Sequence, residues 1–173
     1  MISYGDCMAS KVVSNTGPLM HLYEISLVKA LNSFKEIYIA EEVKNELKGN
    51  KVNVNIFSNV KLIKLKPQFK DVAEILVNKF SLDLGESQSI ALALQEKADY
   101  FLTDDLDART VANVHGIEAH GTVGIILRAF REKIITKEIA ITKVNELHTK
   151  SSLFITKELT DNIIKSINMF KKK

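Results

Sequence analysis

The chain has 173 residues, of which 46% are hydrophobic, so it can form one domain with a substantial core, whereas two independent domains would be cramped. Its formal net charge of +3 permits a polyanionic partner without requiring one, because the electric field depends on where charges gather. Cys7 is the only cysteine, which excludes an intrachain disulfide and a cysteine-based metal site. A reducing, cytoplasmic setting is therefore expected. No stretch approaches the roughly 18 apolar residues of a membrane span, so we expect no membrane partner.

Short apolar runs alternate with helical patterns along the first half of the chain. The predicted elements are a strand at 11–14, a helix at 19–23, further helix at 25–34, a strand at 37–39, a helix at 40–47, a strand at 60–65 and a helix at 69–80. Asn15 follows the first strand, and Pro18 fits the first helical position with Thr16 or Gly17 as the N-cap. Glu46 belongs to the helix at 40–47, where a solvated position is the ordinary expectation for a glutamate.

The stretch at 82–112, LDLGESQSIALALQEKADYFLTDDLDARTVA, combines a helix, a strand and a group of carboxylates. Glu86 lies in the first turn of the predicted helix, where free backbone N–H groups favour an anion. A short strand at 100–103 is followed at once by Asp104, Asp105 and Asp107. One such Asp is most simply a helix N-cap, but three acids within four positions exceed what one cap needs.

The remaining elements are a strand at 116–119, a helix at 125–130 and two or three helices between 134 and 173. Thr122 is expected to cap the helix at 125–130. We expect an N-terminal extension at 1–10, a main domain at 11–154, and a C-terminal helix with a basic tail at 155–173. The closing lysines at 171–173 are most simply a solvated tail.

Alternating strands and helices predict an α/β fold with a parallel sheet that is covered by helices on both faces. In such a sheet Asn15 and the pair Asp104 and Asp105 meet at the carboxyl edge, where ligands bind, and Glu46 and Glu86 can face that edge. Converging carboxylates need a counter-charge, and oxygen ligands favour Mg²⁺ or Mn²⁺. These ions indicate phosphodiester chemistry. No dinucleotide, P-loop, zinc-protease or serine-hydrolase motif is present.

Five blocks in a fixed order carry a resemblance to a known family. They are VVSNTGPL at 12–19, IYIAEEVKNEL at 37–47, LDLGESQSIALAL at 82–94, YFLTDDLDARTVA at 100–112 and HGTVGIILRA at 120–129. Together they resemble PIN-domain proteins, specifically the small prokaryotic branch related to VapC-type toxins. The resemblance implies a three-layer α/β/α sandwich, extra C-terminal helices and a Mg²⁺- or Mn²⁺-dependent ribonuclease for single-stranded RNA. It further implies an antitoxin protein as partner and a homodimer.

The resemblance also assigns residues. It carries the acidic metal-binding and catalytic positions to Glu46, Glu86 and either Asp104 or Asp105: the T-x-D pattern favours Asp105 and the strand geometry favours Asp104. The first acidic position falls on Asn15, where the family usually has Asp and this branch often has Asn. An amide can still bind a hard cation, but with one negative charge fewer we expect weaker metal binding.

Three further residues complete the implied site. Thr16, Arg109 and Thr122 match positions that would orient phosphate or the acids. Two other functions stay open: a non-catalytic PIN module that binds RNA or a partner protein, favoured by Asn15, and a scaffold whose acids all serve as helix caps.

Overall fold

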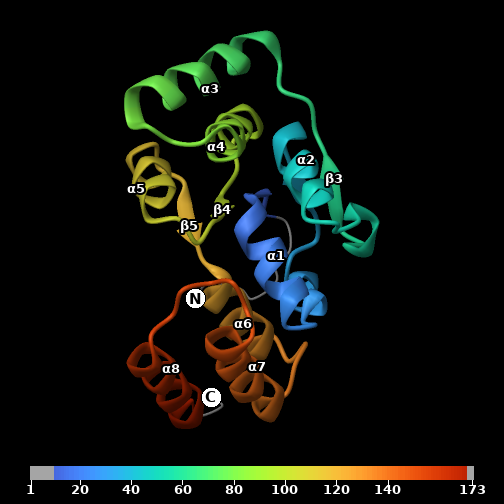
Figure 1. The fold of residues 1–173 in the computed structure, drawn as a ribbon, viewed down its shortest axis with the longest axis vertical. Coiled ribbons are helices and arrows are strands. Elements are labelled where there is room, and N and C mark those ends of the chain that lie inside the picture. Colours follow the sequence, from blue (N-terminus) through green and yellow to red (C-terminus); the bar gives the residue numbers. More distant parts are fainter. Residues whose placement is uncertain (1–9, 171–173) are drawn as a thin grey trace.

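The computed structural model describes residues 10–170. The expected N-terminal extension, except for its last residue, and the basic tail at 171–173 lie outside the described residues. A five-stranded parallel sheet forms the centre of the molecule (Figure 1), as the alternating pattern predicted. Its strands, in the spatial order β3-β2-β1-β4-β5, are β1 (Val12–Ser14), β2 (Ile37–Ile39), β3 (Val60–Leu62), β4 (Tyr100–Leu102) and β5 (Glu118–His120).

Eight α-helices and two short 3-10 helices surround the described sheet. They are α1 (Thr16–Glu24), η2 (Val28–Ser33), α2 (Glu41–Gly49), η3 (Val54–Ile56), α3 (Pro67–Phe80), α4 (Leu84–Glu96), α5 (Leu106–Val114), α6 (Thr122–Arg131), α7 (Lys137–Thr149) and α8 (Lys157–Met169). None of these helices is long and apolar enough to cross a membrane.

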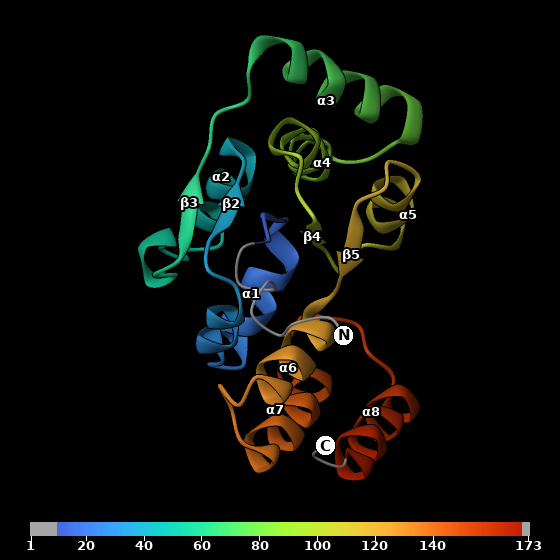
Figure 2. The ribbon, with the colours of Figure 1, turned by 180° about the vertical axis from the view of Figure 1, so that it is seen from behind.

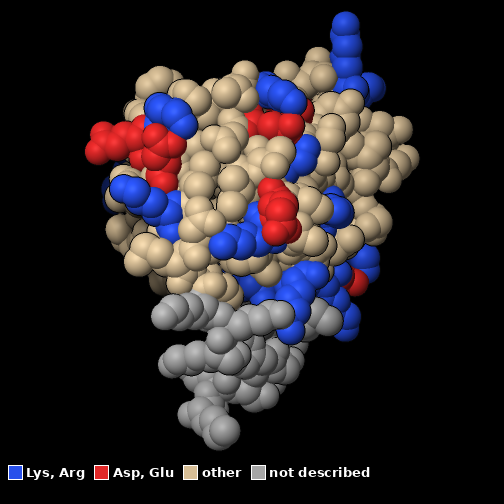
Figure 3. Space-filling view, turned by 90° about the horizontal axis from the view of Figure 1, so that it is seen from below, with Lys and Arg blue, Asp and Glu red and all other residues tan. Residues whose placement is uncertain are grey.

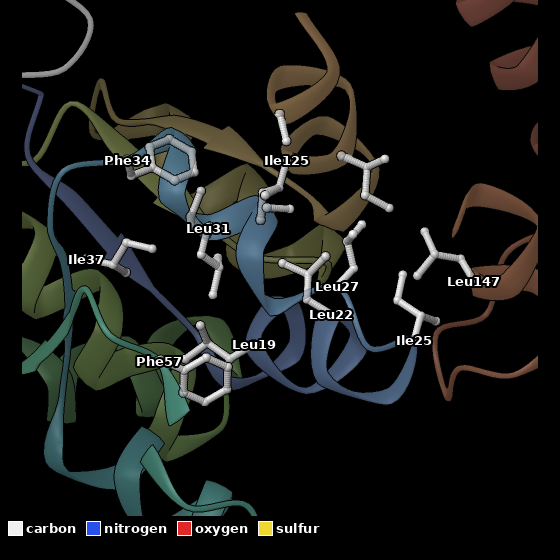
Figure 4. Packing of buried hydrophobic residues seen from close by; sticks show 14 of the residues in the cluster. Leu19, Leu22, Ile25, Leu27, Leu31, Phe34, Ile37, Phe57, Ile125 and Leu147 are labelled. Carbon is white, nitrogen blue, oxygen red and sulfur yellow. The ribbon is translucent and has the colours of Figure 1, made fainter. Parts of the chain in front are cut away.

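Helices cover both faces of the sheet, because neighbouring residues of a strand point to opposite sides. Val12 of β1 belongs to the core shared with α1, η2, α6 and α7, whereas Val13 belongs to the core shared with α4 and α5. The first core is seen in Figure 4, where Leu19 and Leu22 of α1 lie near Leu31 of η2. The back view in Figure 2 places α3 on the outer side of α4. The arrangement is the α/β/α sandwich that the resemblance implied.

Several predicted boundaries were wrong, each for a local reason. The first helix begins at Thr16 with Asn15 as its N-cap, so Pro18 lies within the first turn, where a missing N–H is also harmless. The segment predicted as helix at 25–34 is a 3-10 helix only at Val28–Ser33. The strand predicted at 60–65 ends at Leu62, and the helix predicted at 69–80 begins at Pro67, because proline suits the first helical position.

Candidate active site

The site lies at the carboxyl ends of β1 and β4, which are neighbours in the sheet. Ser14 pairs with Leu102, and the backbone N–H of Asn15 donates to the Leu102 carbonyl at 2.9 Å. The side chain of Asn15 is almost fully buried, and its Oδ1 accepts from the N–H of Thr16 at 2.8 Å. Asn15 is therefore a helix cap at the sheet edge, and one lone pair of its amide oxygen is already in use.

Asp104 is enclosed by three donors. Its Oδ1 accepts from the backbone N–H of Thr122 at 2.7 Å, and its Oδ2 accepts from the Thr122 hydroxyl at 2.5 Å. His21 Nδ1 lies 2.7 Å from the same Oδ2. Burial alone would raise the pKa of Asp104, but the hydrogen bonds from His21 and Thr122 outweigh it and lower that pKa. Because an ionised carboxylate only accepts, His21 Nδ1 carries the hydrogen.

Thr122 has a different role from the one its sequence position suggested. Gly121 is the N-cap of α6, and Thr122 is the first helical residue, with its side chain buried. Gly121 has no side chain that could accept from the free N–H groups of the helix, so the Asp104 carboxylate bonds to the Thr122 N–H instead. An acid at a helix N-terminus is also stabilised by the macrodipole. The expectation that Thr122 caps this helix was therefore wrong.

Asp105 is the N-cap of α5, which is the simplest role expected for an Asp that directly follows a strand. Its Oδ1 accepts from the N–H of Ala108 at 2.7 Å. Arg109 lies one turn further along α5, and its guanidinium donates through Nη2 to the carbonyl of Thr103, just after β4, at 3.3 Å. The Nε of Arg109 is buried and has no hydrogen-bond partner among the described residues.

Glu86 lies in the first turn of α4, as predicted, and it takes part in a capping box. Asp83 accepts from the Glu86 N–H at 2.7 Å, and Glu86 Oε2 accepts from the Asp83 N–H at 3.0 Å. Burial is the largest cause of the rise in the pKa of Glu86 to about 7. The hydrogen bond from the Asp83 backbone lowers that pKa, and the charges of Asp83, Asp105 and Glu46 each raise it by a lesser amount. The Asp-x-x-Glu spacing in the sequence is the signal that indicates this cap.

Glu46 of α2 is the fourth carboxylate of the site. Its Oε2 accepts a short hydrogen bond from the hydroxyl of Thr16, at the start of α1. Burial raises the pKa of Glu46, and the charges of Asp83 and Glu42 raise it further, while the bond from Thr16 acts in the opposite direction. Thr16 thus contacts an acid of the candidate site. The role that the resemblance implied for Thr16, orienting phosphate or the acids, stays a prediction.

The predicted acids therefore fall into two groups. Glu46, Glu86 and Asp105 form one group around Glu86, because the charges of Asp105 and Glu46 both raise the pKa of Glu86. Asp104 belongs instead with His21 and Thr122. Within residues 10–170, no three Asp, Glu, His or Cys side chains are placed to hold a metal ion in the positions they occupy. Internal hydrogen bonds orient the carboxylates of Asp104 and Asp105 toward the N-termini of α6 and α5.

Comparison with known proteins identifies the family. A family model described as a PIN domain, DUF3368, matches residues 11–169. The chain belongs to the PIN-domain family. PIN domains are generally nucleases and usually use divalent metals. The match includes α8, which packs against α7 and contributes Ile167 to the core. A search of curated proteins gave no match.

Proposed function

We propose that this PIN domain is a Mg²⁺- or Mn²⁺-dependent endoribonuclease that cleaves phosphodiester bonds of single-stranded RNA. The observation that carries the proposal is the pair Glu46 and Glu86, brought from two helices to one edge of the sheet with raised pKa values. Half-buried carboxylates that repel one another are unfavourable unless a positive charge joins them. A divalent cation provides that charge and suits ligands that are all oxygen.

Glu46, Glu86 and Asp105 are the residues proposed to hold the ion, because the charges of Glu46 and Asp105 both act on the Glu86 carboxylate. Each keeps acceptor capacity beyond its internal hydrogen bond, since a carboxylate has about four lone-pair positions. Asp104 and Asn15 complete the proposed set through their remaining lone pairs. When bound, the cation neutralises phosphate charge and activates a water for attack on phosphorus.

The neighbouring polar groups support this arrangement. The guanidinium of Arg109, which lies at the sheet edge, is proposed to donate to a phosphate oxygen, a charge-assisted contact that is stronger than a neutral one. The Thr16 and Thr122 hydroxyls hold Glu46 and Asp104 in place. At the end of the molecule seen in Figure 3, Lys and Arg are interspersed with Asp and Glu on the described surface. We therefore place the phosphate contacts at the sheet edge and not on that end.

A second function is favoured by one specific observation, the way Asn15 is used. It carries no charge, and its oxygen caps α1, so the cluster has one negative charge fewer than a site with Asp at this position. A non-catalytic PIN module that binds RNA or a partner protein fits this feature. Glu46, Glu86, Asp104 and Asp105 argue against the non-catalytic module, because clustering carboxylates without an ion is unfavourable.

The biological role is proposed from the family resemblance. The chain would be the toxin half of a toxin–antitoxin pair, would act in the cytoplasm as a homodimer and would be neutralised by an antitoxin protein. Growth arrest on expression of the natural chain, and its absence with Glu86→Gln, would support a toxin. Normal growth with full RNA cleavage in vitro would refute the toxin role while leaving the nuclease intact.

The test of the nuclease itself combines cleavage with binding. Purified protein is incubated with a mixed-sequence single-stranded RNA in Mn²⁺, Mg²⁺ or EDTA, and RNA binding is measured separately by fluorescence anisotropy in EDTA. Cleavage that requires the metal and is lost in Glu46→Gln and Glu86→Gln supports the nuclease. Binding without cleavage in either metal supports the non-catalytic module.

A further inference from the structure

Gly85 is the residue of α4 that faces the carboxylate of Glu46. A Cβ atom built on Gly85 would lie 2.9 Å from Cδ and 3.0 Å from Oε2 of Glu46, and closer still to Oε1. Real Cβ atoms essentially never come this close to another group. Since α2 and α4 lie side by side (Figures 1 and 2), the Glu46 carboxylate occupies the space that a side chain on Gly85 would need.

The backbone gives no other reason for glycine at this position. Gly116 is the glycine with a positive φ among those described, and Gly85 has ordinary helical geometry in the first turn of α4. Glycine is a poor helix former compared with alanine. The helix therefore contains an unfavourable residue at the point where it meets an acid from another helix, and the close contact with Glu46 accounts for it.

The other side of the same carboxylate is held by Thr16, whose hydroxyl donates to Oε2. Glu46 is thus confined between the start of α1 and the start of α4. Gly85 directly precedes Glu86 in the chain, so the confinement also keeps Glu46 near enough to raise the pKa of Glu86.

We propose that Gly85 is a positioning residue for the site. Its missing side chain lets α4 close on the Glu46 carboxylate and keeps that carboxylate beside Glu86, where the two can share one cation. The shared cation rests on the proposed function; the steric relation between Gly85 and Glu46 does not. The two parts are therefore tested separately.

The steric part is tested by a double-mutant cycle on urea unfolding in EDTA, with Gly85→Ala and Glu46→Ala made singly and together. In the Glu46→Ala background, Gly85→Ala should raise the folding equilibrium constant a few-fold, as alanine in place of glycine does in a helix. With Glu46 present, this gain should be lost or reversed, because the carboxylate is displaced. Equal effects in the two backgrounds would overturn the proposal. Gly49→Ala is the control, since a Cβ there meets nothing within 4 Å.

The functional part is tested by Mn²⁺ binding, measured by electron paramagnetic resonance. Gly85→Ala should raise the Mn²⁺ dissociation constant at least tenfold and lower the cleavage rate, while RNA binding in EDTA stays unchanged. Unchanged Mn²⁺ affinity in Gly85→Ala would overturn the positioning role. If the natural protein neither binds Mn²⁺ nor cleaves RNA, the proposed function fails, and the unfolding cycle alone then decides whether Gly85 and Glu46 are coupled.

Discussion

Replacing Glu86 by Gln should stabilise the metal-free protein above neutral pH while it removes activity. The pKa of Glu86 rises from 4.5 to about 7 in the folded state, so the folded protein holds a proton that the unfolded chain has lost over this range. Stability contributed by the protonated group is therefore full below about pH 4.5 and is lost as the pH rises to about 7. Glutamine keeps an oxygen for the capping box but carries no charge.

The magnitude follows from the same values. The rise from 4.5 to about 7 corresponds to about 3 kcal/mol at 1.36 kcal/mol per pKa unit. Because Glu86 is only half-buried, screening by solvent reduces this to about 1–2 kcal/mol. The free energy of unfolding of Glu86→Gln minus that of the natural protein should thus grow by about 1–2 kcal/mol between pH 5 and pH 8.

The assay is urea unfolding in EDTA at a series of pH values, repeated with Mn²⁺. Manganese should stabilise the natural protein at pH 8 and have little effect on Glu86→Gln. Glu74→Gln, at an exposed position on α3, is the matched control and should show no such dependence on pH. A stability difference for Glu86→Gln that stays flat from pH 5 to pH 8 would refute the reasoning about burial and repulsion.

Two further substitutions test the groups that hold the acids. Thr16→Val removes the hydroxyl that donates to Glu46, so Mn²⁺ binding should weaken several-fold by titration, and Thr16→Ser should restore it; equal affinity in all three proteins would exclude a role for the hydroxyl. Gly121→Ala would place a Cβ 2.7 Å from Oδ1 of Asp104, so the free energy of unfolding should fall by about 1–3 kcal/mol in urea. Gly124→Ala, on the same helix, makes only ordinary contacts and should not destabilise, and equal losses at both positions would contradict the account.

The sheet could be predicted from the sequence because each strand is a short apolar run between helical patterns. The run at 12–14 is buried on both faces, as a central parallel strand should be, and the polar residues after β1 and β4 fall at one edge as expected. Helix starts were harder to place. Asn15 caps α1 with its own side chain, a role that its residue type allows but does not fix. Gly121 has no side chain, and α6 relies on the Asp104 carboxylate, which is 18 positions away from Thr122 and belongs to no local pattern.

The internal organisation of the site could not be predicted in the same way. His21 and Asp104 are separated by 83 positions, and their contact depends on how α1 packs beside β4. Likewise, nothing near Gly85 in the sequence indicates that Glu46 fills the space beside it. The sequence also left open whether Asp104 or Asp105 is the acidic position of the site. The two are adjacent after β4, and they differ in the helix end that each carboxylate reaches, which only the packing of α5 and α6 decides.

The most direct test of the proposed nuclease is cleavage of a mixed-sequence single-stranded RNA by the natural protein, by Asn15→Asp and by the double variant Glu46→Gln/Glu86→Gln, each in Mn²⁺ and in EDTA. We expect the natural protein to cleave in Mn²⁺ and not in EDTA, Asn15→Asp to cleave at a lower Mn²⁺ concentration because it adds one negative charge, and the double variant not to cleave. Cleavage by the double variant at the natural rate, or undiminished cleavage in EDTA, would contradict it.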